Sequence, residues 1–149
     1  MRYAICNETF EGWDHERVCR FVAQLGYQGL EIAPFTLARS IEEVSPQRCR
    51  ELRRQAEDYG LTILGLHWLL AKTEGLQLTA ADAAVRQKTA DYLVALARCC
   101  ADLGGEVLVF GSPAQRRIPV GASRAQAVDY ALDTFRRAQN AIADNGVKL

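Results

Sequence analysis

A repeated joint between helix and strand is the feature that most constrains the fold of this chain. Four times, an amphipathic segment ends at a glycine and a short apolar segment follows, with the glycines at Gly26, Gly60, Gly104 and Gly146. Glycine suits the left-handed backbone position that closes a helix. Helices that alternate with strands apolar on both faces predict an α/β fold with a parallel sheet.

The predicted strands and helices form four consecutive units. Short apolar segments that we interpret as strands occupy residues 2–6, 29–33, 62–67 and 107–110. Helices are expected to begin after good N-cap residues at Asp14, Ser45 and Ser123. Thr79 and Asp82 have the spacing of a capping box before the third helix.

The end of the chain suggests an incomplete barrel. Residues 147–149 begin a fifth strand without giving it a helix. A complete (β/α)8 barrel needs roughly 250 residues, and this chain has 149. We therefore expect one domain over residues 1–149. It would be the N-terminal half of a TIM barrel, with four β/α units and the start of strand five, and the chain would be truncated.

Composition excludes several classes of function and favours a cytoplasmic protein. The 18 basic and 18 acidic residues cancel, which gives no electrostatic argument for binding nucleic acid or an anionic membrane. No segment has the length of a transmembrane helix, and the N-terminus lacks the apolar region of a signal peptide. The five cysteines include no Cys-x-x-Cys pair, so we interpret them as reduced core residues.

Alternation along the strands predicts which side chains face the inside of the sheet. Leu30 and Ile32 suit the face covered by helices, so Glu31 points inward. The same rule sends Leu64 and Leu66 toward the helices. It points the side chains of Cys6, Glu8, Ile63 and His67 inward. Polar residues of three consecutive strands are thus expected on one side of the sheet.

Glu8, Glu31 and His67 are the strongest chemical signal in the sequence. Glu8 and His67 lie at the carboxyl ends of their strands, where barrel enzymes build their sites. A carboxylate inside a sheet is costly unless it is paired or serves a metal or a polar ligand. The alternative is structural: Glu31 in a hydrogen-bond network, and His67 as a satisfied histidine at the rim.

Three further features have two interpretations each. Trp68 directly follows His67 and either walls a pocket or packs the loop. Arg116 and Arg117 lie in the loop after the fourth strand, where they either hold a phosphate or carboxylate or are simply exposed. His15, in the first turn of a helix, is expected to be solvent-exposed.

Three segments carry a resemblance to a known family. They are Asn7-Glu8, residues 26–34 (GYQGLEIAP) and residues 65–68 (GLHW). Together they resemble the xylose isomerase-like TIM barrels, the sugar phosphate isomerase/epimerase group that also includes endonuclease IV-type repair enzymes. The resemblance implies a divalent metal (Mn, Mg, Co or Zn) that binds sugar oxygens. It also implies acidic residues that move a proton between adjacent carbons.

The resemblance places most of that machinery outside this chain. Epimerase-type metal ligands come from strands five to eight, beyond Leu149, so no catalytic residue is expected here. What the chain would contribute is substrate binding, by Glu8, Glu31, His67, Trp68, Arg116 and Arg117. The endonuclease IV type also uses a histidine after strand 3 as a metal ligand, a place that His67 matches. Its further histidine after strand 4 is replaced here by residues 111–113 (GSP).

Three hypotheses for function follow. The first is a metal-dependent sugar or sugar-phosphate isomerase/epimerase, inactive as the 149-residue chain alone. The second is a zinc phosphodiesterase acting on abasic DNA. The third is a non-catalytic half-barrel or assembly module. An uncovered inner face, with Ile63 and either Val107 or Leu108, predicts association with the missing barrel half or with further copies of the chain.

Overall fold

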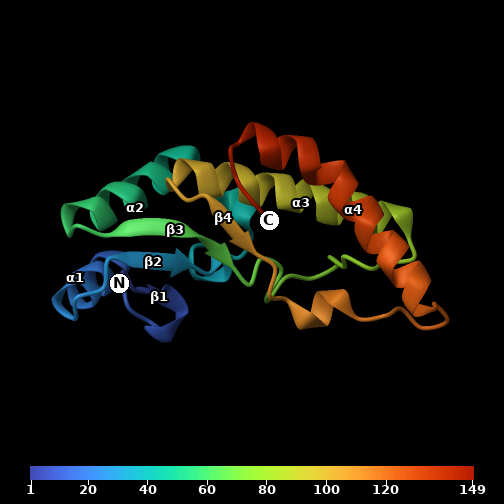
Figure 1. The fold of residues 1–149 in the computed structure, drawn as a ribbon, viewed down its shortest axis with the longest axis horizontal. Coiled ribbons are helices and arrows are strands. Elements are labelled where there is room, and N and C mark those ends of the chain that lie inside the picture. Colours follow the sequence, from blue (N-terminus) through green and yellow to red (C-terminus); the bar gives the residue numbers. More distant parts are fainter.

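The computed structural model describes all residues from 1 to 149 and shows half of a TIM barrel (Figure 1). Four parallel strands lie side by side in chain order: β1 (Ala4–Cys6), β2 (Gly29–Ile32), β3 (Thr62–His67) and β4 (Val107–Val109). Each is followed by a helix: α1 (His15–Gln24), α2 (Pro46–Asp58), α3 (Ala83–Asp102) and α4 (Arg124–Asp144). The predicted fold class and the sequential strand order are confirmed.

Local sequence signals set most of the helix ends. The side chains of Asp14 and Ser45 accept hydrogen bonds from backbone N–H groups in the first turns of α1 and α2. Ser123 and Gln126 form a complete capping box at the start of α4. The four joint glycines all have positive φ, between 69° and 83°. The helix-to-strand joints therefore form as the sequence predicts.

The start of α3 differs from the prediction. Asp82 caps this helix by accepting a hydrogen bond from the N–H of Ala84. Thr79, which was expected to begin the capping box, is buried, and its hydroxyl donates to the carbonyl of Arg117. The predicted capping box is wrong because a tertiary contact uses the Thr79 hydroxyl.

One core lies between the sheet and its helices. In Figure 1, α2, α3 and α4 run along one side of the sheet. Strand residues buried against the helices are Leu30, Ile32, Leu66 and Leu108. Helix residues that pack on them include Val22, Leu52, Leu93 and Leu96. The opposite side of the sheet carries no helix, and it is the inner face of the half-barrel.

A β-bulge in β3 reverses the predicted alternation at Ile63 and Leu64. Leu30 pairs with Ile63 but Glu31 pairs with Gly65, so Leu64 is an extra residue in its strand. Ile63 is consequently buried in the core, whereas Leu64 is 41% exposed and lies against Gly29 on the inner face. The predicted directions of these two side chains are wrong.

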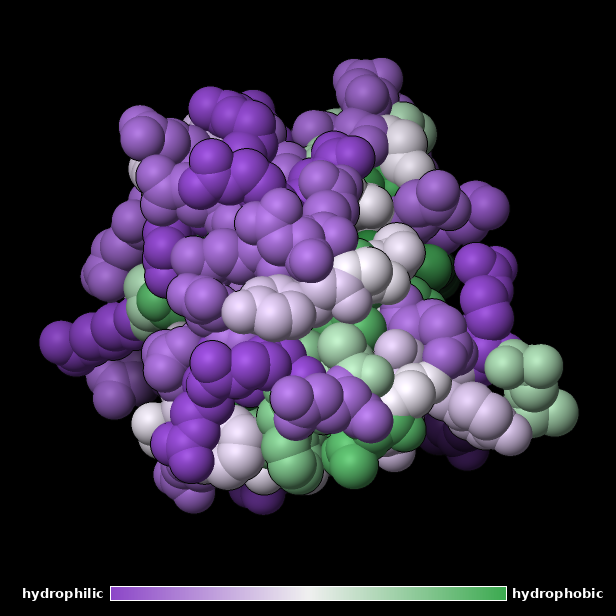
Figure 2. All heavy atoms as spheres, turned by 90° about the vertical axis from the view of Figure 1, so that its left-hand side faces the viewer, coloured by the Kyte–Doolittle hydropathy of each residue, from purple (hydrophilic) through white to green (hydrophobic).

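The inner face is apolar at the amino ends of the strands. Exposed side chains there include Leu64 and Val107. Figure 2 looks at this end of the molecule, where hydrophobic side chains are grouped among hydrophilic ones. Of the two alternatives for strand four, Val107 is the uncovered residue, because Leu108 is buried.

Residues near the C-terminus pair with β4 as a fifth strand would. Lys148 forms a parallel bridge with Val107. The N–H of Leu108 donates to the carbonyl of Lys148, and the N–H of Lys148 donates to the carbonyl of Glu106, both at 2.8 Å. The predicted start of strand five is therefore present.

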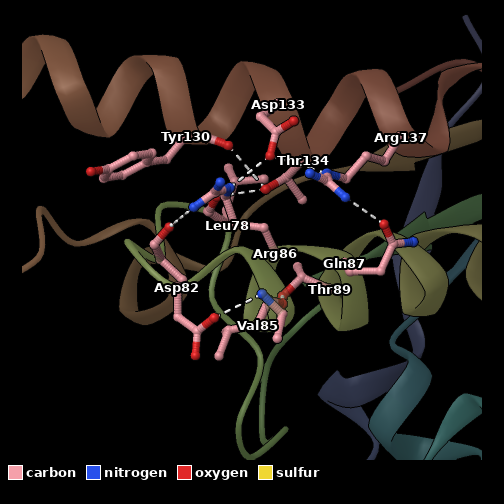
Figure 3. A network of polar contacts seen from close by, with 12 residues as sticks. Leu78, Asp82, Val85, Arg86, Gln87, Thr89, Tyr130, Asp133, Thr134 and Arg137 are labelled. Carbon is pink, nitrogen blue, oxygen red and sulfur yellow. Dashed lines mark hydrogen bonds and ion pairs between the residues drawn. The ribbon is translucent and has the colours of Figure 1, made fainter.

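A polar network holds the long loop after β3 against α3 and α4 (Figure 3). The guanidinium of Arg86 donates to Asp133 at 2.7 Å and to the carbonyls of Ala80 and Ala81 at 2.8 Å. Beside it, the hydroxyl of Thr134 donates to the carbonyl of Leu78 at 2.9 Å. These contacts satisfy the buried end of the loop and position the chain that leaves the carboxyl end of β3.

Four of the five cysteines are core residues as predicted, and the prediction is wrong for Cys6, whose thiol bonds to Glu31. All five cysteines are free, and all but Cys6 are buried. The thiols of Cys49 and Cys99 lie in contact, with their sulfur atoms 3.1 Å apart. No helix combines the length and apolar character that crossing a bilayer requires.

Candidate active site

Polar side chains from three strands meet at the carboxyl end of the inner face. Cys6 ends β1, Glu8 lies in the short 3-10 turn η1 (Asn7–Thr9) that follows it, Glu31 belongs to β2, and His67 ends β3. The predicted placement of Glu8, Glu31 and His67 on one side is confirmed by contacts between them. Glu8 and Glu31 both approach the His67 ring, one at each nitrogen.

His67 is the centre of this group. Its Nε2–H donates to Glu8 Oε2 at 2.6 Å, and its Nδ1 lies 3.9 Å from Glu31 Oε2. The side chain is only 6% exposed, and Nδ1 is buried without a hydrogen-bond partner. A buried polar atom left unpaired costs about 1–3 kcal/mol. His67 is therefore held in place by Glu8 and has one ring nitrogen free to bind something else.

The backbone around Glu8 is fixed by its neighbour. Asn7 Oδ1 accepts a hydrogen bond from the N–H of Ala33 at 2.9 Å, and Asn7 Nδ2 donates to Thr36 at 2.7 Å. These bonds tie η1 to the loop after β2. The turn that presents the Glu8 carboxylate is thus held from two sides.

Cys6 is a member of the site that sequence reasoning missed. Its thiol donates to Glu31 Oε2 at 3.3 Å. Burial, followed by the hydrogen bond and charge of Glu31, raises the pKa of Cys6 to about 12. The alternation that placed Glu8 inward also applied to Cys6, so a signal existed. It was overlooked because a cysteine in an apolar strand is usually a core residue.

A cavity of about 820 Å³ opens beside Glu8. Its wall includes Trp13, Phe35, Trp68 and Lys72. Trp68 is 46% exposed. Its φ is 53°, and a positive φ is uncommon for a residue other than glycine. The Lys72 ammonium lies 4.3 Å from the centre of the Phe35 ring. An aromatic wall that also carries Lys72 and Arg48 thus adjoins the polar group.

His15 also lines this cavity and is not the exposed residue that was expected. Its Nε2 lies 3.0 Å from the carbonyl oxygen of Leu52 and 3.4 Å from the sulfur of Cys19. Burial is the main cause that lowers the pKa of His15 below its ordinary value. The prediction is wrong because α1 turns the ring toward α2 and away from solvent.

The two arginines of the loop after β4 lie apart from this cavity. Arg116 ends the 3-10 turn η4 (Pro113–Arg116), and both Arg116 and Arg117 are exposed. Neither side chain lines the cavity beside Glu8. The nearby Ser112 is buried, and its hydroxyl accepts a hydrogen bond from the N–H of Leu70. Ser112 therefore stabilises the loop after β3.

The arrangement can bind hydroxyl groups and a cation. Two carboxylates and an imidazole offer hydrogen-bond acceptors and donors within one small volume. The ligand atoms of Cys6, Glu31 and His67 all lie within 4.8 Å of one another, so these residues can also hold a metal ion. Aromatic faces beside them can pack on the apolar side of a small ring.

Solved structures with the same fold include several epimerases. D-psicose 3-epimerase in the presence of D-fructose matches with a TM-score of 0.79 and 18% identity, over 100% of this chain and 51% of that one. A 3-keto-D-glucoside 4-epimerase from E. coli matches with 0.72 and 15% identity, over 99% and 54%. A sugar phosphate isomerase/epimerase from Parabacteroides distasonis matches with 0.65 and 15% identity, over 98% and 49%.

The chain spans about half the length of these solved structures. At such low identity the likeness shows a shared fold. Among curated proteins, none matches the chain by sequence. The family described as xylose isomerase-like TIM barrel matches residues 19–149, which is most of the sequence. The chain therefore belongs to the xylose isomerase-like TIM barrel family.

Proposed function

We propose that this chain is the N-terminal half of a metal-dependent sugar or sugar-phosphate isomerase/epimerase. The observation that carries the proposal is the group of Glu8, Glu31 and His67 at the carboxyl end of the inner face. Membership of the family and the epimerases among the structural neighbours support the same class of reaction. In this reaction a proton moves between adjacent carbons of a small sugar.

The polar group would bind and orient the hydroxyl groups of the substrate. The free Nδ1 of His67 and the carboxylate of Glu31 are acceptors for a hydroxyl donor. Glu8 holds the His67 ring in one orientation and favours the tautomer with hydrogen on Nε2. A substrate hydroxyl would thus meet a preorganised acceptor, which lowers the cost of orienting it.

The cavity beside Glu8 supplies shape and charge for the same substrate. Trp68 and Phe35, whose ring centres are 6.4 Å apart, present aromatic faces to it. Lys72 adds a positive charge that suits a phosphate or a carboxylate. Arg116 and Arg117, which lie in the loop after β4, are proposed as a second cationic site for a phosphate.

A divalent metal belongs to the proposed reaction, and one residue of this chain fits it. The Nδ1 of His67 is buried and has no hydrogen-bond partner. An imidazole nitrogen that carries no hydrogen can bind a metal. When bound, the metal would polarise the substrate oxygens as a Lewis acid. Its other ligands, and the groups that move the proton, are proposed to come from beyond Leu149. The 149-residue chain alone is therefore proposed to be inactive.

The remaining partners and hypotheses follow from the same reasoning. We propose a cytoplasmic enzyme whose uncovered inner face is completed by the other barrel half or by a second copy of the chain. The alternative action on abasic DNA shares the histidine at the end of β3, His67, but lacks the further histidine after β4. That place is held by residues 111–113 (GSP), of which Ser112 bonds to Leu70.

The proposal is tested by turnover on a panel of ketoses and ketose phosphates with added Mn²⁺. The complete protein is expected to interconvert at least one pair of epimers or isomers, and a chelator should abolish the reaction. The 149-residue chain is the matched control and is expected to show no turnover. Metal-dependent cleavage of abasic DNA by the complete protein, without any sugar activity, would overturn the proposal.

A further inference from the structure

Three side chains with different ligand atoms converge at the ends of β1, β2 and β3. Cys6 Sγ lies 3.3 Å from Glu31 Oε2, and the same oxygen lies 3.9 Å from His67 Nδ1. All three ligand atoms lie within 4.8 Å of one another. Each residue belongs to a different strand, so the sheet itself holds the group together.

Two of these separations are close to those expected of a tetrahedral zinc site. Zinc binds sulfur at about 2.3 Å and nitrogen or oxygen at about 2.0–2.2 Å, so neighbouring ligand atoms lie roughly 3.3–3.6 Å apart. The observed 3.3 Å lies at the lower edge of that range and the observed 3.9 Å lies just above it, so the ligands would have to move slightly when an ion binds. Thiolate favours zinc or cobalt over magnesium or calcium, which prefer oxygen ligands.

The free nitrogen of His67 points independently to a bound ion. The ring is almost completely buried, yet Nδ1 has no hydrogen-bond partner. Its other nitrogen donates to Glu8 Oε2. Metal-binding histidines commonly donate their second N–H to a carboxylate, which fixes the ring and its tautomer. Glu8 and His67 show this arrangement on the side of the ring away from Cys6 and Glu31.

We propose that Cys6, Glu31 and His67 form a binding site for a thiophilic divalent cation such as Zn²⁺, with Glu8 as a positioning residue. Binding would release the thiol proton of Cys6 to solvent, so that a thiolate and a carboxylate balance the two charges of the ion. Three protein ligands leave one tetrahedral position for water or a substrate oxygen. All three proposed ligands belong to this chain, including the His67 nitrogen named above for the divalent metal, so the ion can bind without residues from beyond Leu149.

Cobalt spectroscopy tests the site without reference to catalysis. Metal-free protein is titrated with Co²⁺, which reports thiolate coordination by a charge-transfer band and tetrahedral geometry by intense visible bands. We expect one equivalent of Co²⁺ to produce both signals and one equivalent of Zn²⁺ to remove them. Mg²⁺ should have no effect. Absence of the thiolate band in folded wild-type protein would overturn the proposal.

Variants distinguish this site from the contact between His15 and Cys19. Cys6→Ser should abolish the thiolate band, and Glu31→Gln should weaken Zn²⁺ binding at least tenfold in competition with a chromophoric chelator. Glu8→Gln should weaken it about 10–100-fold, as expected for a group that orients a ligand. His15→Gln is the matched control, because His15 is the chain's other histidine and lies 3.4 Å from the sulfur of Cys19, and it should leave Co²⁺ and Zn²⁺ binding unchanged.

The wild-type spectrum keeps the test decisive if a variant fails to fold. Circular dichroism establishes whether each variant is folded before its metal binding is measured. Zn²⁺ should also raise the melting temperature of the wild type, since a ligand that binds only the folded state stabilises it. A thiolate band that persists in Cys6→Ser would assign the metal to another cysteine and contradict the proposal. Neither result depends on sugar turnover, so the proposed function can fail or succeed separately.

Discussion

The two ends of the inner sheet face have opposite chemistry although the same strands form both. At the carboxyl end, Glu31 lies beside His67, whose ring nitrogen Nδ1 is buried and unpaired. At the amino end, Leu64 and Val107 expose apolar surface. The first arrangement is costly for folding unless a ligand uses it, and the second is costly unless another surface covers it. One end is therefore suited to binding, and the other to association.

The largest expected effect comes from Gly65, which lies between the two ends. A Cβ at Gly65 would lie 1.8 Å from the carbonyl oxygen of Val107, so β4 would have to move. We expect Gly65→Ala to lower the free energy of unfolding by at least about 3 kcal/mol. Urea denaturation measures it.

Gly121→Ala is the control for this substitution. Gly121 has φ 81° but no atom near its Cβ position, so only the backbone cost of about 1–2 kcal/mol applies. If the two variants lose the same free energy of unfolding, the close approach of β3 and β4 at Gly65 does not contribute to stability.

The next largest loss of stability is expected at Arg86, which holds the loop that leaves the carboxyl end of β3. Arg86→Ala removes the donor that satisfies the carbonyls of Ala80 and Ala81, and we expect it to cost about 2 kcal/mol in urea denaturation. Arg136→Ala, an exposed arginine on α4, is the matched control and should change stability by less than about 0.5 kcal/mol. Equal losses would mean that the network in Figure 3 does not support this end.

Cys6 gives the carboxyl end its own pH dependence in metal-free protein. Its pKa is raised from 9.0 to about 12, so the folded state keeps the thiol proton that the unfolded chain releases. The stabilisation from Cys6 is therefore complete below pH 9 and is lost as the pH rises toward 12. Melting temperatures of wild type and Cys6→Ser, measured from pH 8 upward, should show the steeper fall in wild type. Parallel curves would contradict this environment for Cys6.

The smallest effect on stability is expected at the amino end. Leu64→Ser replaces a side chain that is already 41% exposed, so we expect a change below about 0.5 kcal/mol. The same change should reduce self-association of the 149-residue chain in light scattering, because it removes uncovered apolar surface. Val120→Ser, at a fully exposed loop position, should leave association unchanged. A wild-type chain that is monomeric at high concentration would contradict the comparison.

Local patterns predicted much of the fold. The joint glycines, the N-caps at Asp14 and Ser45 and the bounds of β3 all follow from neighbouring residues in the sequence. The alternation rule failed at Leu64 because a bulge depends on how β2 and β3 approach each other, and no local signal marks it. Thr79 failed for a similar reason, since its hydroxyl bonds to the distant Arg117.

The candidate site was predicted in its charged residues but not in its surroundings. Glu8 and His67 were found because charge inside a sheet is unusual enough to stand out. Cys6 was missed because an apolar role explains it equally well before Glu31 is seen beside it. Phe35 and Lys72 come from loops, whose course over the cavity depends on tertiary contacts.

The most direct test of the account measures His67→Ala in the complete protein, for turnover and melting temperature together. We predict a rate lower by the equivalent of about 2–4 kcal/mol of transition-state stabilisation on the ketose panel with Mn²⁺. The melting temperature should change little, because His67 makes one hydrogen bond, to the partly exposed Glu8. An unchanged rate with a clearly lower melting temperature would make His67 a structural residue and contradict the account.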